Sequence, residues 1–140
     1  MNRRQFLVTT GLSVGLVATR PKMLRAEAGV TVYTPGLVQN KLDAGETVFV
    51  DYAAEWCGTC KRQERVVDAL RASNSEYDSN ISFVRVDWDT YKSHEITKRY
   101  RVPRRSTLLL LRGDEELGRI VAGTSAAKIK ALMDLGLVDS

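Results

Sequence analysis

The two cysteines constrain the fold of this chain more than any other feature. Cys57 and Cys60 are the only cysteines among the 140 residues, and two residues separate them. They follow an apolar, strand-like run over residues 48–53 and open a helix-like run over residues 61–70. A cysteine pair at a strand-to-helix junction can form and break a disulfide, so the pattern predicts reversible thiol chemistry.

The first 28 residues are typical of a cleavable export signal. Arg3 and Arg4 precede an apolar stretch, and an A-x-A cleavage site ends at Ala28. The arginine pair resembles a twin-arginine signal, with an ordinary secretory signal as the alternative. The apolar stretch is shorter than the roughly 20 residues of a membrane span, so no stable anchor is expected after cleavage. Both routes predict a periplasmic location.

The basic charge of the chain belongs to this signal. The whole chain holds 21 basic and 17 acidic residues, a net charge of +4. Residues 1–28 hold five basic and one acidic residue, which leaves residues 29–140 balanced at 16 of each. The basic pI is therefore no argument for a nucleic-acid partner. Residues 29–140 have the length of one compact domain.

Hydrophobic periodicity predicts alternating strands and helices in the remaining chain. Residues 47–53 are so rich in β-branched and aromatic side chains that the strand should be central and buried on both faces. Helices between the early strands predict a parallel core, and a short turn at Gly113 predicts an antiparallel C-terminal hairpin. The fold class is α/β, a mixed sheet with helices on both faces. The expected strands cover residues 30–33, 47–53, 81–86, 107–111 and 117–121, and the expected helices cover residues 37–42, 57–72, 93–100 and a segment capped by Ser125.

With these elements in place, the chain resembles the thioredoxin family over roughly residues 31–138. Residues 50–61 match the family's active-site segment at most positions, including Asp51 and Trp56 beside the cysteine pair. Residues 107–110 match the strand after the family's proline loop. The resemblance implies a thioredoxin fold and thiol–disulfide exchange.

Two positions depart from the family pattern. Thr59 stands where cytosolic thioredoxins have proline, and Ser106 stands where the family has a cis-proline. In the family this second loop lies against the active-site sulfurs and binds substrate backbone. Without proline a cis bond costs about 2.5–4 kcal/mol, so both cis and trans remain open before Ser106.

Cys57 is the expected nucleophile. It stands at the start of a helix, where unpaired N–H groups and the helix dipole favour a thiolate, and we expect it at an exposed helical tip. Cys60 lies one turn inward and is expected to resolve the mixed disulfide that Cys57 forms. The alternative is a static structural disulfide, which is common in exported proteins.

Asp51 is an acid within a buried strand, so its pKa should rise. The resemblance implies that it passes protons to and from Cys60. The alternative is a structural pairing with Arg85. Arginine does not give up its proton, so Arg85 could also hold Asp51 ionised.

Substrate contacts are expected from Trp56, Ser106 and Arg105. Trp56 could equally be a packing residue, and His94 is expected at the surface. Five basic residues precede or flank Ser106, and they either acidify Cys57 and steer acidic partners or form an ordinary solvated surface. They are Lys98, Arg99, Arg101, Arg104 and Arg105.

The sequence therefore predicts an exported thiol–disulfide oxidoreductase that reduces protein disulfides through Cys57 and Cys60. It needs no cofactor, takes disulfide-containing proteins as clients and requires a membrane thiol reductase as electron donor. One alternative is a dithiol oxidase that uses the same site. Another is a metal- or iron–sulfur-binding protein in which a second chain completes the ligand set. A binding module with incidental cysteines is the third.

Overall fold

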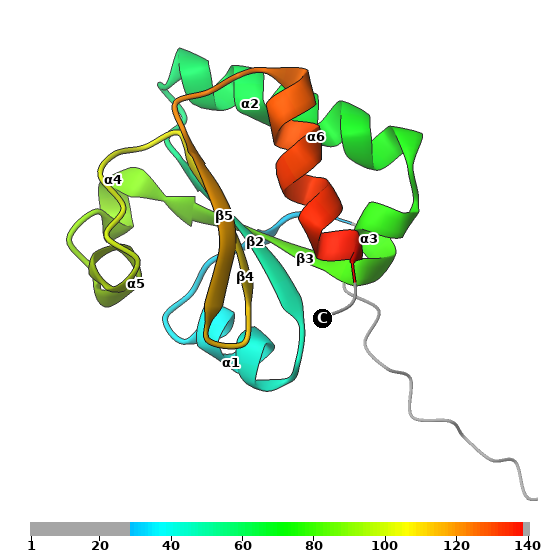
Figure 1. The fold of residues 1–140 in the computed structure, drawn as a ribbon. Coiled ribbons are helices and arrows are strands. Elements are labelled where there is room, and N and C mark those ends of the chain that lie inside the picture. The colour runs from blue at the N-terminus through cyan, green and yellow to red at the C-terminus, as the bar shows by residue number, and fades with distance from the viewer. Residues whose placement is uncertain (1–28, 139–140) are drawn as a thin grey trace, which may run out of the picture.

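The computed structural model describes residues 29–138, which form a five-stranded mixed sheet with helices on both faces (Figure 1). The predicted export signal, residues 1–28, lies outside the described residues. Among residues 29–138, no helix combines the length and apolar character needed to cross a membrane. The elements, in chain order, are β1 Thr31–Val32, α1 Leu37–Asp43, β2 Thr47–Ala53, α2 Gly58–Ser73, α3 Glu76–Asn80, β3 Ile81–Asp87, α4 Trp88–Tyr91, α5 Glu95–Arg99, β4 Thr107–Arg112, β5 Glu115–Val121, α6 Ala126–Asp134 and the 3-10 turn η1 Leu135–Leu137.

Strand β2 is the middle strand of the sheet, whose order is β1-β3-β2-β4-β5. All seven of its residues are buried, which confirms the predicted central strand. Strands β1 and β2 both run parallel to β3, while β4 runs antiparallel to β2 as well as to β5. The sequence predicted antiparallel pairing only for the hairpin. The N–H of Ser106 donates to the carbonyl of Tyr52 at 2.7 Å, so β4 starts beside the end of β2 and runs back along it.

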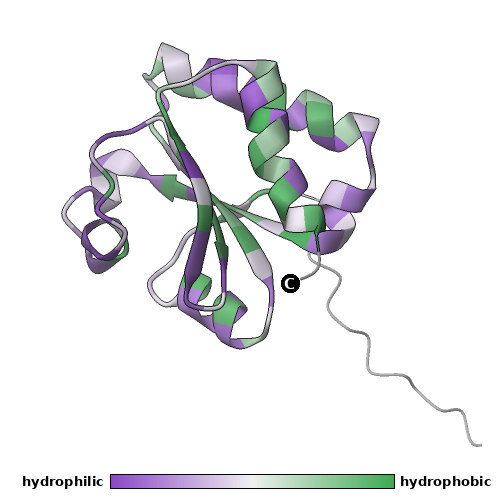
Figure 2. Cartoon of the chain, in the orientation of Figure 1, coloured by the Kyte–Doolittle hydropathy of each residue, from purple (hydrophilic) through white to green (hydrophobic). Residues whose placement is uncertain are grey.

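Successive side chains of β2 point to opposite faces and so divide the core in two. Val48, Val50 and Tyr52 pack in the core on the side of α1 and α5. Phe49 packs in the other core with residues of α2, α3 and α6. The hydrophobic colour in Figure 2 accordingly concentrates in the central strands, whereas the helices mix both colours. The cysteine pair follows the C-terminal end of β2 and packs in a separate small cluster with Ala53 and Ala54.

Three short elements were not predicted from the sequence: α3, α4 and η1. Each has three to five residues, too few to show a repeating apolar pattern. The final helix begins as predicted, because the Ser125 hydroxyl accepts a hydrogen bond from the N–H of Lys128.

Candidate active site

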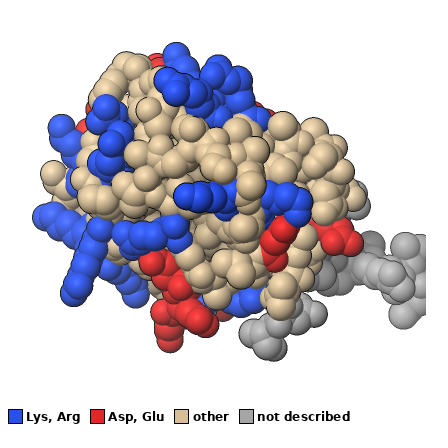
Figure 3. Space-filling model, turned by 45° about the horizontal axis from the view of Figure 1, so that its top comes forward, with Lys and Arg blue, Asp and Glu red and all other residues tan. Residues whose placement is uncertain are grey.

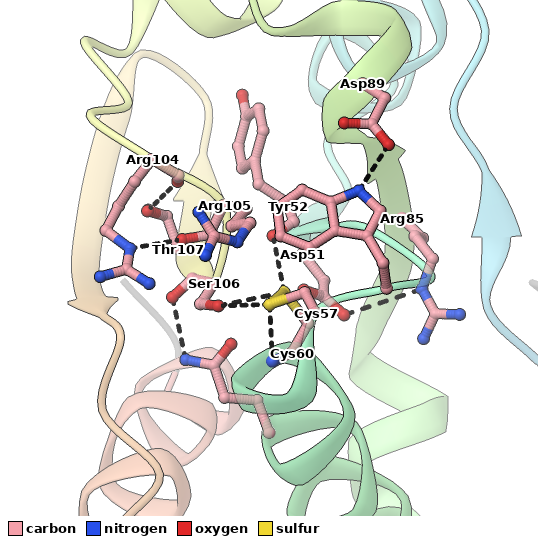
Figure 4. The surroundings of a disulfide bond; sticks show 12 residues. Asp51, Tyr52, Cys57, Cys60, Arg85, Asp89, Arg104, Arg105, Ser106 and Thr107 are labelled. Carbon is pink, nitrogen blue, oxygen red and sulfur yellow. Dashed lines mark hydrogen bonds and ion pairs between the residues drawn. A yellow bond between two sulfur atoms is a disulfide. The ribbon is translucent and has the colours of Figure 1, made fainter.

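Cys57 and Cys60 are joined by a disulfide at the start of α2, with their Cα atoms 5.3 Å apart (Figure 4). Cys57 is the N-cap residue, and its Sγ accepts a hydrogen bond from the N–H of Cys60 at 3.2 Å. The sulfur therefore occupies the position at which unpaired helix N–H groups and the helix dipole favour negative charge. A thiolate on Cys57 is stabilised there.

Both sulfurs lie inside the protein. Cys57 is 3% exposed and Cys60 is 2% exposed. The burial predicted for Cys60 is confirmed, but the exposed tip expected for Cys57 is wrong. The reason is the loop before β4, which places Ser106 against the disulfide, while Ala53 and Ala54 pack around it.

Ser106 is the central residue of that loop. Its hydroxyl oxygen lies 3.2 Å from the Sγ of Cys57 and 3.0 Å from the Sγ of Cys60, and the residue is fully buried. No peptide bond among residues 29–138 is cis, so the bond before Ser106 is trans. Instead Ser106 adopts φ 64°, in the left-handed region that disfavours residues other than glycine. Its N–H and carbonyl are both engaged within the protein, so a client could use them only after these contacts opened.

Gln63 is a site residue that sequence reasoning missed. It is fully buried on α2, and its Nε2 donates to the carbonyls of Ser106 and Gly123, at 2.9 Å each. It lies three residues after Cys60 and four before Val67, on the buried face of the helix. A polar residue at a buried helical position was the available signal, because buried polar groups need partners.

Asp51 lies in β2 on the face that packs against α2. Its Oδ2 is 3.8 Å from the Nε of Arg85, while its Oδ1 is buried without a hydrogen-bond partner among the described residues. Burial raises the pKa of Asp51 to about 7, although the Arg85 charge lowers it and the Glu64 carboxylate adds to the rise. The raised pKa is as predicted. Arg85 does not hold the carboxyl firmly ionised, because desolvation outweighs its charge and its guanidinium also binds Glu64 at 2.8 Å.

Two cavities share Glu64 and Arg85 in their linings. A groove of about 630 Å³ beside the disulfide is lined by Cys60, Glu64 and Arg85 among others. A small cavity of about 10 Å³ lies against Asp51 and shares Glu64 and Arg85 with the groove. Glu64 and Arg85 thus line both the space at Asp51 and the groove at Cys60.

Trp56 and Arg105 form a surface pair next to the disulfide. Trp56 is 60% exposed, its Nε1 donates to the Asp89 carboxylate at 2.8 Å, and the Arg105 guanidinium lies 4.4 Å from its ring centroid. The ring is therefore fixed from two sides while most of it faces solvent. The two partners of the indole, Asp89 and Arg105, are labelled in Figure 4.

The basic residues around this loop differ in exposure. Lys98, Arg99 and Arg101 are exposed, whereas Arg104 and Arg105 are half-buried. Figure 3 shows lysine and arginine side chains gathered on the side of the molecule that carries α5, at the left of the view. This side offers positive charge to a partner.

The single histidine serves the fold locally. His94 is the N-cap of α5, and its ring packs edge-on against Tyr33 and Tyr91. Within residues 29–138, no three His, Cys, Asp or Glu side chains gather closely enough to hold a metal ion.

Known proteins that resemble this chain have the same fold. A family model described as thioredoxin matches residues 30–135. The chain is 36% identical to Thioredoxin H2-1 of Oryza sativa over 74 residues, which cover 53% of this chain and 49% of that protein. It is 34% identical over 94 residues to the thiol:disulfide interchange protein DsbD of a Pseudomonas strain, covering 63% of this chain and 16% of that protein. The chain thus spans about half of the first relative and less than a fifth of the second. A solved structure, Trxlp from Edwardsiella tarda, superimposes with a TM-score of 0.64 at 32% identity over 74% of this chain and 98% of that one.

Proposed function

The chain belongs to the thioredoxin family, and on that premise we propose that it reduces disulfide bonds in exported client proteins. The observation that carries the proposal is the Cys57–Cys60 disulfide at the N-terminus of α2. A sulfur at this position is activated as a thiolate by the helix, and a second sulfur one turn inward is within bonding distance of it.

The reaction proceeds by two thiol–disulfide exchanges. In the reduced protein the Cys57 thiolate attacks a client disulfide, so that a mixed disulfide forms and one client sulfur leaves as a thiolate. Cys60 then loses its proton and attacks Cys57, which releases the second client sulfur. The client gains two electrons, the Cys57–Cys60 pair loses two, and the departing thiolates take up protons.

Asp51 is the proposed proton carrier for Cys60. A carboxyl with a pKa of about 7 exchanges its proton readily near neutral pH. Glu64 and Arg85 line both the cavity at Asp51 and the groove at Cys60, which supports a proton path between the carboxyl and the thiol along this polar pair. The charge on Arg85 offsets the negative charge that Asp51 acquires.

The client surface is proposed to centre on Trp56 and Arg105. The exposed indole gives an apolar contact next to the disulfide, and the stacked guanidinium adds a positive charge. Acidic or polar segments that flank a client disulfide would match this surface.

Export and electron supply complete the proposal. The arginine pair and the cleavage pattern of residues 1–28 support export to the periplasm and cleavage after Ala28. A reductant in that compartment needs a continuous supply of electrons, so a membrane thiol reductase is the proposed donor. The similarity to a protein named as a thiol:disulfide interchange protein supports this class of partner.

Disulfide reduction and trapping test the proposal together. The purified chain is expected to accelerate the reduction of insulin by dithiothreitol, and a rate equal to that of dithiothreitol alone would refute the activity. Cys60→Ser is expected to accumulate mixed disulfides with periplasmic proteins, because the resolving thiol is missing. Cys57→Ser is the matched control and is expected to trap none. Trapping by Cys57→Ser alone would reverse the two assignments.

A further inference from the structure

The Ser106 hydroxyl lies between the two reactive sulfurs, 3.2 Å from that of Cys57 and 3.0 Å from that of Cys60. A disulfide carries no proton, so in this oxidised state the hydroxyl must be the donor. It has one hydrogen, which points to one sulfur at a time, and two acceptor sites. Its hydrogen-bonding capacity is therefore only partly used while the disulfide is closed.

The main chain holds this hydroxyl in place independently of the disulfide. The Ser106 N–H donates to Tyr52 in β2, and its carbonyl accepts from Ala122 after β5 and from Gln63 in α2. Contacts from β2, from α2 and from the residue after β5 hold the Ser106 backbone, and none of them depends on the disulfide.

The backbone of Ser106 is strained as well. At φ 64° a glycine would be the favoured residue, and a serine there is conformationally strained. The side chain is fully buried and touches the reactive sulfurs. A strained, buried polar residue in contact with reacting atoms is typical of a functional constraint.

We propose that the Ser106 hydroxyl is a catalytic hydrogen-bond bridge between Cys57 and Cys60, a role that rests on the proposed thiol–disulfide exchange. In the reduced protein it accepts a hydrogen bond from the Cys60 thiol and donates one to the Cys57 thiolate. Both its donor and an acceptor site are then used. Bonds to a charged partner are stronger than neutral ones, so the bridge stabilises the reduced state more than the disulfide.

The bridge also serves the second exchange. Once Cys57 is bound to a client sulfur it carries no charge, and Cys60 must pass its proton to the proposed carrier Asp51 before it attacks. The hydroxyl hydrogen then turns from Cys57 to the Cys60 thiolate. When Cys60 attacks, the new Cys57–Cys60 bond forms, the client–Cys57 bond breaks, and the client sulfur leaves with the electron pair and takes a proton from water.

Two substitutions at Ser106 test the bridge through the reactivity of Cys57. Ser106→Ala removes the hydroxyl, and Ser106→Gly removes it while fitting the left-handed backbone, so that at least one variant folds. The measurement is the pH profile of iodoacetamide alkylation of the reduced chain, with Cys57 identified by peptide mapping. Both variants are expected to react about tenfold more slowly at pH 6 and at the wild-type rate above pH 9. Their disulfides are also expected to be about tenfold harder to reduce in equilibrium with glutathione.

A buried serine away from the sulfurs supplies the control. Ser82 in β3 is 6% exposed, and its hydroxyl bonds to Glu46. Ser82→Ala is expected to leave the alkylation profile unchanged. A wild-type profile in folded Ser106→Gly, or an equal change in Ser82→Ala, overturns the bridge. Because alkylation needs no client, failure of the unmodified chain to reduce insulin would instead overturn the proposed function.

Discussion

At the scale of single residues, Asp51 links the chemistry of the site to the stability of the fold. Its carboxyl is buried beside Arg85, and burial raises its pKa from 3.8 to about 7. Between these two pH values the folded protein keeps a proton that the unfolded chain has lost. The contribution of Asp51 to the free energy of unfolding is therefore fully present below about pH 4, and it is lost as the pH rises towards the folded pKa.

Asp51→Asn should abolish this decline. From pH 4 to pH 8 the oxidised wild type is expected to lose up to about 4 kcal/mol of unfolding free energy, because three pKa units each correspond to about 1.4 kcal/mol. The variant should be nearly as stable as the wild type at pH 4 and clearly more stable at pH 8. Urea unfolding at both pH values measures the difference, with the exposed Asp114→Asn as control. An equal pH dependence in Asp51→Asn and the wild type would contradict the buried-acid account.

Trp56 separates client binding from stability. Its ring is 60% exposed, so Trp56→Ala should change the unfolding free energy by less than about 1 kcal/mol. Loss of the apolar surface beside the disulfide is expected to raise KM for a protein client several-fold while kcat changes little. Steady-state reduction of insulin measures both constants, and Val121→Ala, an exposed apolar residue of β5, is the control. A normal KM in Trp56→Ala would remove this residue from the client surface.

At the scale of elements, the C-terminal turn η1 packs so closely against β3 that position 136 has no room for a side chain. A Cβ added at Gly136 would lie 2.6 Å from the Cδ1 and 2.8 Å from the Cγ1 of Ile81 in β3. Gly136→Ala is therefore expected to destabilise the protein by about 1–3 kcal/mol through overpacking. Gly29→Ala meets nothing within 4 Å and should have little effect. Equal urea midpoints for the two variants would show that η1 shifts freely.

Much of this architecture followed from periodicity along the chain. The apolar run of β2 and the helical spacing in α2 act over neighbouring residues, so the sequence alone predicted both elements and the position of the cysteine pair at the start of the helix. The antiparallel β2–β4 pairing and the burial of Cys57 depend on the loop at Ser106, some 50 residues further on. Gln63 was missed for the same reason, since its partners Ser106 and Gly123 are distant in sequence. Local patterns specify elements, whereas the closure of the site comes from contacts between them.

At the scale of the whole molecule, the export route can be tested through the two arginines near the N-terminus. If residues 1–28 form a twin-arginine signal, changing Arg3 and Arg4 together to lysine should block export, because that route reads the arginine pair itself. A general secretory signal needs only positive charge and should tolerate the change. Cell fractionation with N-terminal sequencing measures the outcome, and an exported chain should begin at Gly29. Normal export of the double-lysine variant would favour the secretory route.

The near-complete enclosure of the disulfide has a consequence for electron flow in the cell. A diffusing small-molecule thiol is expected to reach a sulfur that is 3% exposed more slowly than a docked protein donor does. A protein donor can use the binding energy of a whole interface to displace the loop at Ser106 that encloses the disulfide. Two thiol–disulfide systems could then work in one compartment without exchanging electrons. The slow access of small thiols to the disulfide would keep them apart, with no need for a difference in reduction potential.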